Sequence, residues 1–313
     1  MTEEIPTRNA YGEALVELGA KNEDVVVLDA DLAGSTRTTY FAEEYEDRFF
    51  QVGIAEQNMM GMAAGLATCG KVAFASTFAV FGSARVADQI RNSIAYPNLN
   101  VKIAVTHAGI TVGPDGATHQ SVEDLSILRA IPNMTVIVPA DYTEAKAATK
   151  AAAEYDGPVY LRFGRVGTPV VFAEEDYKFE WGKVNVVEEG SDVTIFAAGM
   201  MLAKALEAKE ELAQEDISAE VVNVHTIKPL DVEGVVASAK KTGAVVTAEE
   251  HNIYGGLGSA IAEAVAENYP VPVKRVGVKD TFGKSGAPKE LIEEFDLTAE
   301  EIVKNVKEVI KKK

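Results

Sequence analysis

Residues 7–31, TRNAYGEALVELGAKNEDVVVLDAD, contain a helical pattern followed directly by a strand-like run, and this order indicates the fold class. Apolar side chains recur at helical spacing between residues 7 and 22, and a glycine lies near the end of that segment. Residues 25–31 form a short apolar run that is typical of a buried strand. Since a helix joined to a buried strand is the repeating unit of α/β proteins, this stretch predicts a parallel sheet covered by helices.

The same alternation continues along the chain. Further strand-like runs occur at residues 71–77, 101–109, 135–141 and 158–165. Residues 173–192 are charged and irregular and hold the only tryptophan, and the alternation restarts after them. We therefore predict an α/β protein of two doubly wound domains, residues 1–175 and a smaller domain of residues 185–313 that also has a mostly parallel sheet.

Charge and composition exclude several classes of function. The 48 acidic residues against 30 basic residues give a formal charge of −18, so we expect neither nucleic acid nor a membrane as a partner. The N-terminal residues lack the pattern of a leader peptide, and no apolar run is long enough to span a bilayer. The single cysteine, Cys69, is interpreted as a buried reduced thiol, and together these features predict a cytoplasmic protein.

Histidines mark the expected ligand side of the sheet. In open α/β sheets ligands bind beyond the carboxyl ends of the strands, where His107 ends one strand-like run. His119 and Asp115 belong to the Gly/Asp loop that follows, so the three residues form one polar candidate region. His225 and His251 also end strand-like runs in the second domain, and for them a structural role is the favoured interpretation.

A lone carboxylate, Glu56, opens the apolar helical stretch of residues 51–70, QVGIAEQNMMGMAAGLATCG. Apolar or small residues lie on every face of this pattern, which predicts a helix buried all round, and Gly61 and Gly65 allow close backbone approach. Burial in such a setting favours the protonated form of a carboxyl group. The alternative is that Glu56 only complements the dipole of the helix N-terminus.

Two glycine-rich turns carry weaker signals. Residues 255–259, GGLGS, could form a phosphate-binding turn at the start of a helix, although most such turns are only tight connections. Residues 113–116, GPDG, offer Asp115 as a metal ligand, but no other carboxylates cluster near it in the sequence. We therefore predict a hydrogen-bonding loop at residues 113–116 and no metal ligands in this chain.

Several strings in fixed order resemble the transketolase family of thiamine diphosphate enzymes. They are DADLAGST (29–36), GIAEQNMMGMAAGLA (53–67), STFAVFGSARVADQIR (76–91), THAGITVGPDGATHQSVEDLSILRAIPNMTVIVPAD (106–141) and HTIKPLD (225–231). The resemblance covers nearly the whole chain and implies a pyrimidine-binding domain followed by the family's C-terminal domain.

The family's diphosphate-binding motif is absent from this sequence. That motif is Gly-Asp-Gly with a later Asn, and the nearest match here is Asp156-Gly157 with Asn185, where Tyr155 replaces the first glycine. The resemblance therefore implies the C-terminal subunit of a split transketolase. A separate N-terminal subunit would supply the diphosphate half of the site and bind Mg²⁺ or another divalent cation, in an assembly with two copies of each subunit.

The resemblance assigns cofactor-binding residues. Glu56 matches the glutamate that hydrogen-bonds N1′ of the aminopyrimidine of thiamine diphosphate, and Asp31 matches a residue near the cofactor at the domain contact. Phe78 and Phe81 match aromatic residues that stack around the aminopyrimidine. Their spacing also suits two core aromatic residues on one helix face, and that alternative stays open.

Phosphate contacts are implied in the same way. Arg8, Ser35 and Arg162 match the residues that bind the sugar phosphate in the family, and a guanidinium fork with a hydroxyl suits a phosphate dianion. Arginines at strand ends also form plain salt bridges, which is the alternative for each of them.

The remaining assignments concern the sugar itself. His107, Asp115 and His119 match residues that bind the ketose hydroxyls or assist proton transfer, as a neutral imidazole can near pH 7. The resemblance thus implies that Glu56, His107 and His119 are catalytic.

The activity implied is reversible transfer of a two-carbon ketol unit between a ketose phosphate and an aldose phosphate, as in the pentose phosphate pathway. A β subunit of a 2-oxoacid dehydrogenase and a deoxyxylulose-phosphate synthase share much of the pattern and are the enzyme alternatives. The third alternative is a regulatory module that kept the fold without turnover. The intact Glu56, His107 and His119 favour an enzyme.

Overall fold

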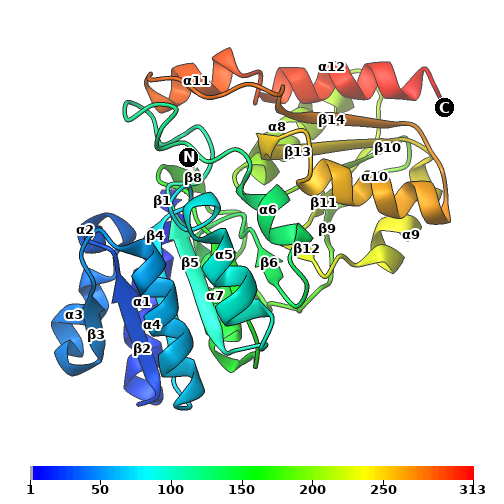
Figure 1. The fold of residues 1–313 in the computed structure, drawn as a ribbon. Coiled ribbons are helices and arrows are strands. Elements are labelled where there is room, and N and C mark those ends of the chain that lie inside the picture. The colour runs from blue at the N-terminus through cyan, green and yellow to red at the C-terminus, as the bar shows by residue number, and fades with distance from the viewer. Residues whose placement is uncertain (1–2) are drawn as a thin grey trace.

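The computed structural model describes residues 3–313, in which two α/β units lie side by side (Figure 1). The first unit contains a seven-stranded sheet in the order β12-β6-β7-β5-β4-β2-β3. Its strands are β2 Val25–Asp29, β3 Phe49–Gln51, β4 Val72–Phe78, β5 Val101–Thr106, β6 Thr135–Ile137, β7 Val159–Arg162 and β12 Thr226–Lys228. β12 is antiparallel to β6 and the other neighbours are parallel, which confirms the predicted α/β fold with a mostly parallel sheet.

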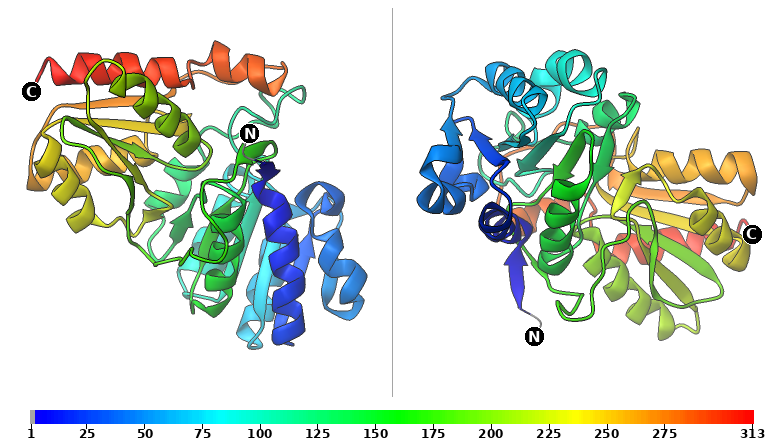
Figure 2. Two further views of the ribbon diagram at one scale, coloured as in Figure 1. Left: turned by 180° about the vertical axis from the view of Figure 1, so that it is seen from behind. Right: turned by 90° about the horizontal axis from the view of Figure 1, so that it is seen from below.

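Helices cover both faces of this sheet, because its central strands are apolar on both sides (Figure 2). α1 and α7 pack against one face, and α4 with residues 84–95 packs against the other. The helices of the unit are α1 Thr7–Lys21, α2 Ala33–Thr36, α3 Thr39–Glu44, α4 Glu56–Thr68, α5 Ala87–Gln89, α6 Asp124–Ala130 and α7 Tyr142–Glu154. Residues 84–95 form a 3₁₀ turn, the short α5 and a π-helical turn.

α4 is buried on one face only, so the prediction of a helix buried all round is wrong. Glu56, Met59 and Ala63 face the core, whereas Gly61 and Gly65 are exposed and have open space around them. Cys69 follows the end of α4 and is exposed, so its interpretation as a buried thiol is also wrong. Small and apolar residues occur on both the face of α4 that packs on the sheet and the face that is exposed. The apolar composition of α4 therefore does not distinguish the two faces.

The second unit contains a five-stranded sheet in the order β14-β13-β10-β11-β9. Its strands are β9 Asn185–Glu188, β10 Val193–Ala197, β11 Ala219–Asn223, β13 Val245–Asn252 and β14 Val273–Val278, and its helices are α8 Met201–Ala213, α9 Val232–Thr242, α10 Leu257–Asn268, α11 Pro288–Glu294 and α12 Ala299–Ile310. α8 and α12 pack on one face of the sheet, and α9 and α10 pack on the other. β9 is antiparallel to β11 and lies inside the segment 173–192 that the sequence predicts to be irregular.

The two units share structure across the predicted boundary. β12 comes from the second half of the chain but pairs with β6 of the first sheet. One apolar cluster also continues from α4 through α6 to α9 and α10. A separate ribbon pairs β1 Glu4–Pro6 with β8 Gly167–Pro169. The domain limits of 1–175 and 185–313 therefore stay a prediction, and residues 1–2 lie outside the described part of the chain. Among residues 3–313, none of the helices is both long and apolar enough to cross a membrane.

Candidate active site

Arg8 joins two segments at the carboxyl end of the first sheet. The first turn of α1 places its Nη1 atom 2.8 Å from the carbonyl oxygen of Ser35, to which it donates, and 3.4 Å from Nε2 of His107. Burial, and then the neighbouring cations Arg37 and Arg165, lower the pKa of Arg8 to about 10. Three guanidinium groups near one strand end make this region attractive to an anion.

His107 directly follows β5 and adopts a left-handed backbone conformation with φ of 58°. Its ring stacks on Phe78, with 3.8 Å between ring centroids, and its Nδ1 lies 2.8 Å from the hydroxyl of Thr106. Burial and the nearby arginines, first among them Arg8, lower the pKa of His107 to about 3. The imidazole is therefore neutral near pH 7, as the proposed hydroxyl-binding role requires.

Phe78, which stacks on His107, also packs against a second aromatic residue, Phe81. Phe78 is the last residue of β4, and its ring lies nearly parallel to that of Phe81, 6.0 Å away between centroids. Phe81 in turn meets the ring of His119 edge-on at 5.4 Å and lies under the guanidinium of Arg85 at 4.2 Å. Phe81 is only half-buried, so part of its surface is available to a ligand.

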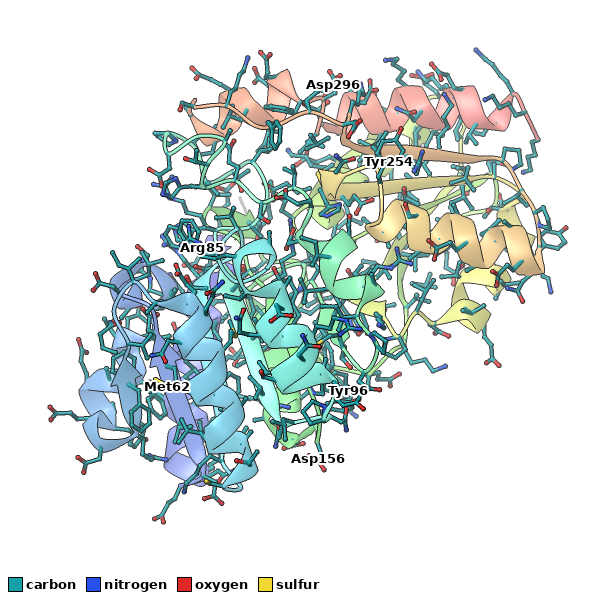
Figure 3. All side chains as sticks on the ribbon, in the orientation of Figure 1. Met62, Arg85, Tyr96, Asp156, Tyr254 and Asp296 are labelled. Carbon is teal, nitrogen blue, oxygen red and sulfur yellow. The ribbon has the colours of Figure 1, made fainter. Side chains whose placement is uncertain are left out.

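Glu56 is the first residue of α4 and is 4% exposed. Arg85 Nη1 donates to Glu56 Oε1 at 2.8 Å, so the expected apolar setting for this carboxyl is wrong. A buried carboxylate needs a compensating partner, and Arg85 is the cation within reach. In Figure 3, Arg85 lies at the upper end of the first unit, away from Tyr96 and Asp156 at its lower end.

The contacts connect most of the predicted residues into one continuous set. The contacts run from Ser35 through Arg8, His107 and Phe78 to Phe81, which contacts both His119 and Arg85, and Arg85 pairs with Glu56. Asp31 and Asp115 lie outside this set and are exposed. Asp31 lies two residues beyond the end of β2, has a φ of 65°, and its backbone N–H donates to Gln51 Oε1 at 2.6 Å.

Arg162 is a structural residue of the interior. Its Nε donates to Asp124 Oδ2 at 2.8 Å, and its Nη2 donates to Asp124 Oδ1 at 3.2 Å and to the carbonyl oxygen of Glu250 at 3.0 Å. Burial lowers the pKa of Arg162, the Asp124 carboxylate raises it, and the net shift is upward. Arg162 therefore forms a buried salt bridge, which was the alternative to an open phosphate contact. Arg162 is the last residue of β7, and its side chain still lies in the packed interior.

Sequence reasoning missed three arginines of the site, Arg37, Arg85 and Arg165. Arg37 Nε donates to Asn9 Oδ1 at 2.9 Å, which keeps it beside α1. Arg165 donates to the carbonyl oxygen of Val112 in the Gly/Asp loop. The available signal for Arg165 was its position in the loop three residues beyond the end of β7, where a side chain is free of the sheet.

The GGLGS turn does not present an open anion site. The backbone N–H groups of Leu257 and Gly258, at the start of α10, donate to the two carboxylate oxygens of Glu249 at 2.7 and 2.8 Å. Since a carboxylate of the same chain fills the helix N-terminus, the alternative of a tight connection holds.

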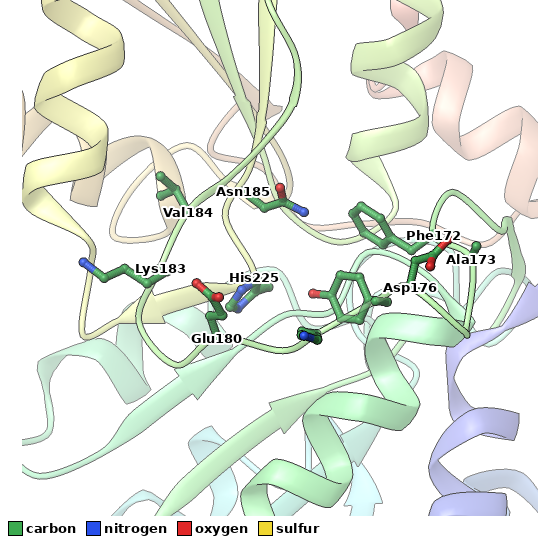
Figure 4. Close-up of a pocket in the computed structure, with 10 residues that line it drawn as sticks. Phe172, Ala173, Asp176, Glu180, Lys183, Val184, Asn185 and His225 are labelled. Atoms are coloured by element: carbon green, nitrogen blue, oxygen red, sulfur yellow. The ribbon is translucent and has the colours of Figure 1, made fainter.

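A hollow of about 510 Å³ lies under the segment that connects the two units (Figure 4). It is lined by Phe172, Ala173, Asp176, Tyr177, Lys178, Glu180, Lys183, Val184, Asn185 and His225. Burial lowers the pKa of His225 to about 4, and its ring packs on Phe179 with 4.5 Å between centroids. The hollow contains none of the predicted site residues, and His225 has the packing of a structural residue.

The fold and this set of contacts define a class of protein, an open α/β protein with a candidate polar site beyond the carboxyl ends of parallel strands. Residues 3–169 match the family model described as transketolase, pyrimidine binding domain, and residues 182–302 match transketolase, C-terminal domain. The chain belongs to the transketolase family.

Three known proteins show how far this similarity extends. The chain is 52% identical to a transketolase C-terminal section of Methanocaldococcus jannaschii, over 97% of this chain and 96% of that protein. It is 49% identical to a 6-deoxy-6-sulfo-D-fructose transketolase subunit of a Clostridium species, over 98% and 95% of the two chains. A solved structure of a split gene transketolase, an inactive beta4 tetramer, has 56% identity, a TM-score of 0.93 and 99% coverage of both chains. The chain thus corresponds over nearly its whole length to proteins that are themselves named as a section or a subunit of transketolase.

Transketolases generally use thiamine diphosphate, and the observed residues fit its pyrimidine end. Glu56 offers a buried carboxylate to an aminopyrimidine, and Phe81 offers an accessible aromatic face. The buried Nε atom of Arg8 has no hydrogen-bond partner among the described residues, which leaves a donor for an anionic ligand. Within residues 3–313, no three acidic, histidine or cysteine side chains form a group that could hold a metal ion.

Proposed function

We propose that this chain forms the pyrimidine side of a split transketolase that transfers a two-carbon ketol unit from a ketose phosphate to an aldose phosphate. The observation that carries the proposal is the continuous set of contacts from Arg8 through His107, Phe78 and Phe81 to Glu56. It brings an anion-binding group, a neutral imidazole, aromatic faces and a buried carboxylate to one end of one sheet.

Each residue of the set has a defined part in the proposal. Bound thiamine diphosphate supplies the electron sink for cleavage of the carbon–carbon bond. Glu56 binds the aminopyrimidine and holds or shares a proton at its carboxyl group, whose Oε1 also accepts from Arg85. Phe78 and Phe81 orient the ring by stacking, with Asp31 at the edge of the cofactor site.

The substrate-binding residues are of two kinds: some bind the charged end of the sugar, and others form hydrogen bonds to its hydroxyl groups. Arg8 binds the anionic end of the sugar with Arg37, Arg165 and Ser35 beside it. Neutral His107 and half-buried His119 bind hydroxyls and move protons, and Asp115 lies in the same loop.

The anionic group of the substrate can be a phosphate or a sulfonate. The proposal of sugar phosphates follows the family, whereas the relative from Clostridium is named for a sulfonated sugar. A cluster of arginines attracts either group, because both present several acceptor oxygens and negative charge. We therefore place the substrate in the class of ketoses with a terminal anionic group.

The proposal includes an N-terminal subunit that carries the diphosphate-binding domain with Mg²⁺ or another divalent cation. Its support is that the chain spans nearly all of relatives that are themselves named as a section or a subunit of transketolase. We propose a cytoplasmic assembly with two copies of each subunit.

Reconstitution tests the proposal. The chain is assayed alone and with a candidate N-terminal subunit, with thiamine diphosphate and magnesium, for two-carbon transfer from xylulose 5-phosphate and from a 6-sulfonated ketose. We expect activity only for the pair of subunits. Activity of the chain alone contradicts the split site, and decarboxylation of 2-oxoacids by the pair instead supports the dehydrogenase alternative.

A further inference from the structure

A carboxylate of the second unit reaches into the loop that carries His107. Glu250, near the end of β13, is 6% exposed, and its Oε1 accepts the backbone N–H of Thr111 at 2.8 Å. The two residues are 139 positions apart in the chain: Glu250 lies in the second sheet, and Thr111 lies in the loop that follows β5 of the first sheet. The hydrogen bond therefore links the second unit directly to the segment that follows β5.

Gly109 allows the loop to pass close to the Glu250 carboxylate. A Cβ atom at Gly109 would lie 2.2 Å from Cδ of Glu250, and Gly109 has a φ of 74°, a conformation that glycine adopts without strain. The loop thus passes directly over the carboxylate because residue 109 has no side chain. His107 lies only two residues earlier, so a change in the path at Gly109 moves its backbone.

The backbone of Glu250 is itself fixed to the first unit. Arg162, paired with Asp124, donates from Nη2 to the carbonyl oxygen of Glu250 at 3.0 Å. The position of the Glu250 carboxylate is therefore set from both sides of the boundary between the sheets.

The far end of the same loop also rests on the second unit. Gln120 Nε2 donates to the carbonyl oxygen of Ile110 at 2.9 Å and to that of Lys284 at 3.0 Å. Gly116 lies against Ser285, where an added Cβ would be 2.5 Å from the serine hydroxyl oxygen. Two separate segments of the second unit hold the loop between His107 and Gln120.

We infer that Glu250 is a positioning residue for His107, through which the second unit sets the geometry of the site. The inference rests on the proposed function only in that it gives His107 a role in catalysis. Glu250 has no contact with the ring of His107 and acts through the Thr111 N–H and the backbone at Gly109.

Glu249 provides a matched control. It is the adjacent residue on β13, it is also buried, at 2% exposed, and its carboxylate also accepts backbone N–H groups. Its partners, Leu257 and Gly258, lie in the second unit itself. Loss of Glu249 therefore perturbs α10 without removing a contact to the His107 loop.

Hydrogen exchange of the full-length chain, measured by mass spectrometry, tests the inference without any assay of activity. In Glu250→Ala, we expect amides of residues 107–113 to exchange about fivefold faster than in the wild type, since a lost hydrogen bond is worth roughly 1 kcal/mol. Glu250→Gln keeps an oxygen acceptor and should retain most of the protection. Glu249→Ala should speed exchange at residues 256–260 and leave residues 107–113 unchanged.

Unchanged protection of residues 107–113 in Glu250→Ala, or the same loss in Glu249→Ala, overturns the inference. If Glu250→Ala does not fold, Glu250→Asp replaces it, because the shorter side chain keeps the charge but withdraws the acceptor from Thr111. With an active pair of subunits, Glu250→Ala should lower kcat more than it raises KM, and Glu250→Gln should restore kcat. Absence of transketolase activity in the wild type refutes the proposed function, while the exchange result still decides the role of Glu250.

Discussion

Arg85 and Glu56 form an ion pair at the mouth of α4, with 2.8 Å between Nη1 and Oε1. The carboxylate is buried and the guanidinium is 45% exposed, so solvent screens part of the attraction. Arg85→Ala leaves Glu56 buried without its cation, and we expect the free energy of unfolding to fall by about 1–2 kcal/mol. Urea denaturation measures this change.

The double variant Arg85→Ala/Glu56→Gln is the control for that loss. It removes the unpaired charge, and we expect it to recover most of the lost stability, as removal of both partners usually costs less than removal of one. Equal stability of Arg85→Ala and the wild type contradicts the importance of the pair.

Glu56→Gln is expected to reduce turnover strongly while the fold stays intact. The amide retains the shape of the side chain but does not hold or share an acidic proton with the aminopyrimidine. Loss of a positioned proton-transfer group costs about 10²–10⁴ in rate. Single-turnover and steady-state assays of the reconstituted pair measure the effect, and circular dichroism checks the fold. Turnover near that of the wild type refutes the proton role of Glu56.

Arg8→Ala is expected to weaken binding of the anionic end of the substrate and to leave binding of the rest of the sugar unchanged. A charged hydrogen bond is worth about 1.5–3 kcal/mol, so kcat/KM for a phosphorylated ketose should fall by about 10- to 100-fold. An unphosphorylated ketose of the same chain length is the control, and its kcat/KM should change little. An equal loss for both sugars indicates that Arg8 only maintains the position of His107, 3.4 Å away.

Local sequence was sufficient to predict the alternation of strands and helices and the end of the sheet at which most of the candidate site residues lie. β2 and α1 follow from their apolar patterns, and His107 follows from its position after a strand-like run. The type of each element and the position of a residue after it depend on neighbouring residues in the chain, so the local periodicity of the sequence predicts them.

The pairings of charged groups depend on contacts between distant segments. Arg85 reaches Glu56 across 29 residues and Glu250 reaches Thr111 across 139, and no periodic pattern encodes either distance. Arg162 and Arg165 differ by three positions, yet the end of β7 buries the first and leaves the second in a loop. To predict which of the two arginines is accessible, the last residue of β7 must be known to within about one position. Sequence patterns do not define strand ends that closely.

Arg162 and Asp124 lead to a stability prediction that separates a structural role from a phosphate contact. Arg162→Met leaves the carboxylate of Asp124 buried with only Tyr160 as a close side-chain donor, and we expect a loss of about 3–5 kcal/mol in the free energy of unfolding. Arg162→Met/Asp124→Asn should be more stable than Arg162→Met alone. Denaturant unfolding measures both variants. An unchanged unfolding curve with a raised KM for the phosphorylated substrate restores Arg162 as a phosphate contact.

Buried His225 makes stability depend on pH in a defined window. Burial lowers its pKa from an ordinary value of 6.5 to about 4, so the folded protein favours the neutral ring. Below pH 6.5 the unfolded chain takes up a proton that the folded chain does not, and stability falls as the pH falls toward 4. The contribution of His225 is complete above pH 6.5, and about 2 kcal/mol of it should be lost by pH 5. Comparison with His225→Gln isolates this loss, since the other titrating groups, including His107, are common to both proteins. We expect the stability difference between wild type and variant to shift by that amount between pH 7.5 and 5, and a difference that is independent of pH contradicts the burial of a neutral His225.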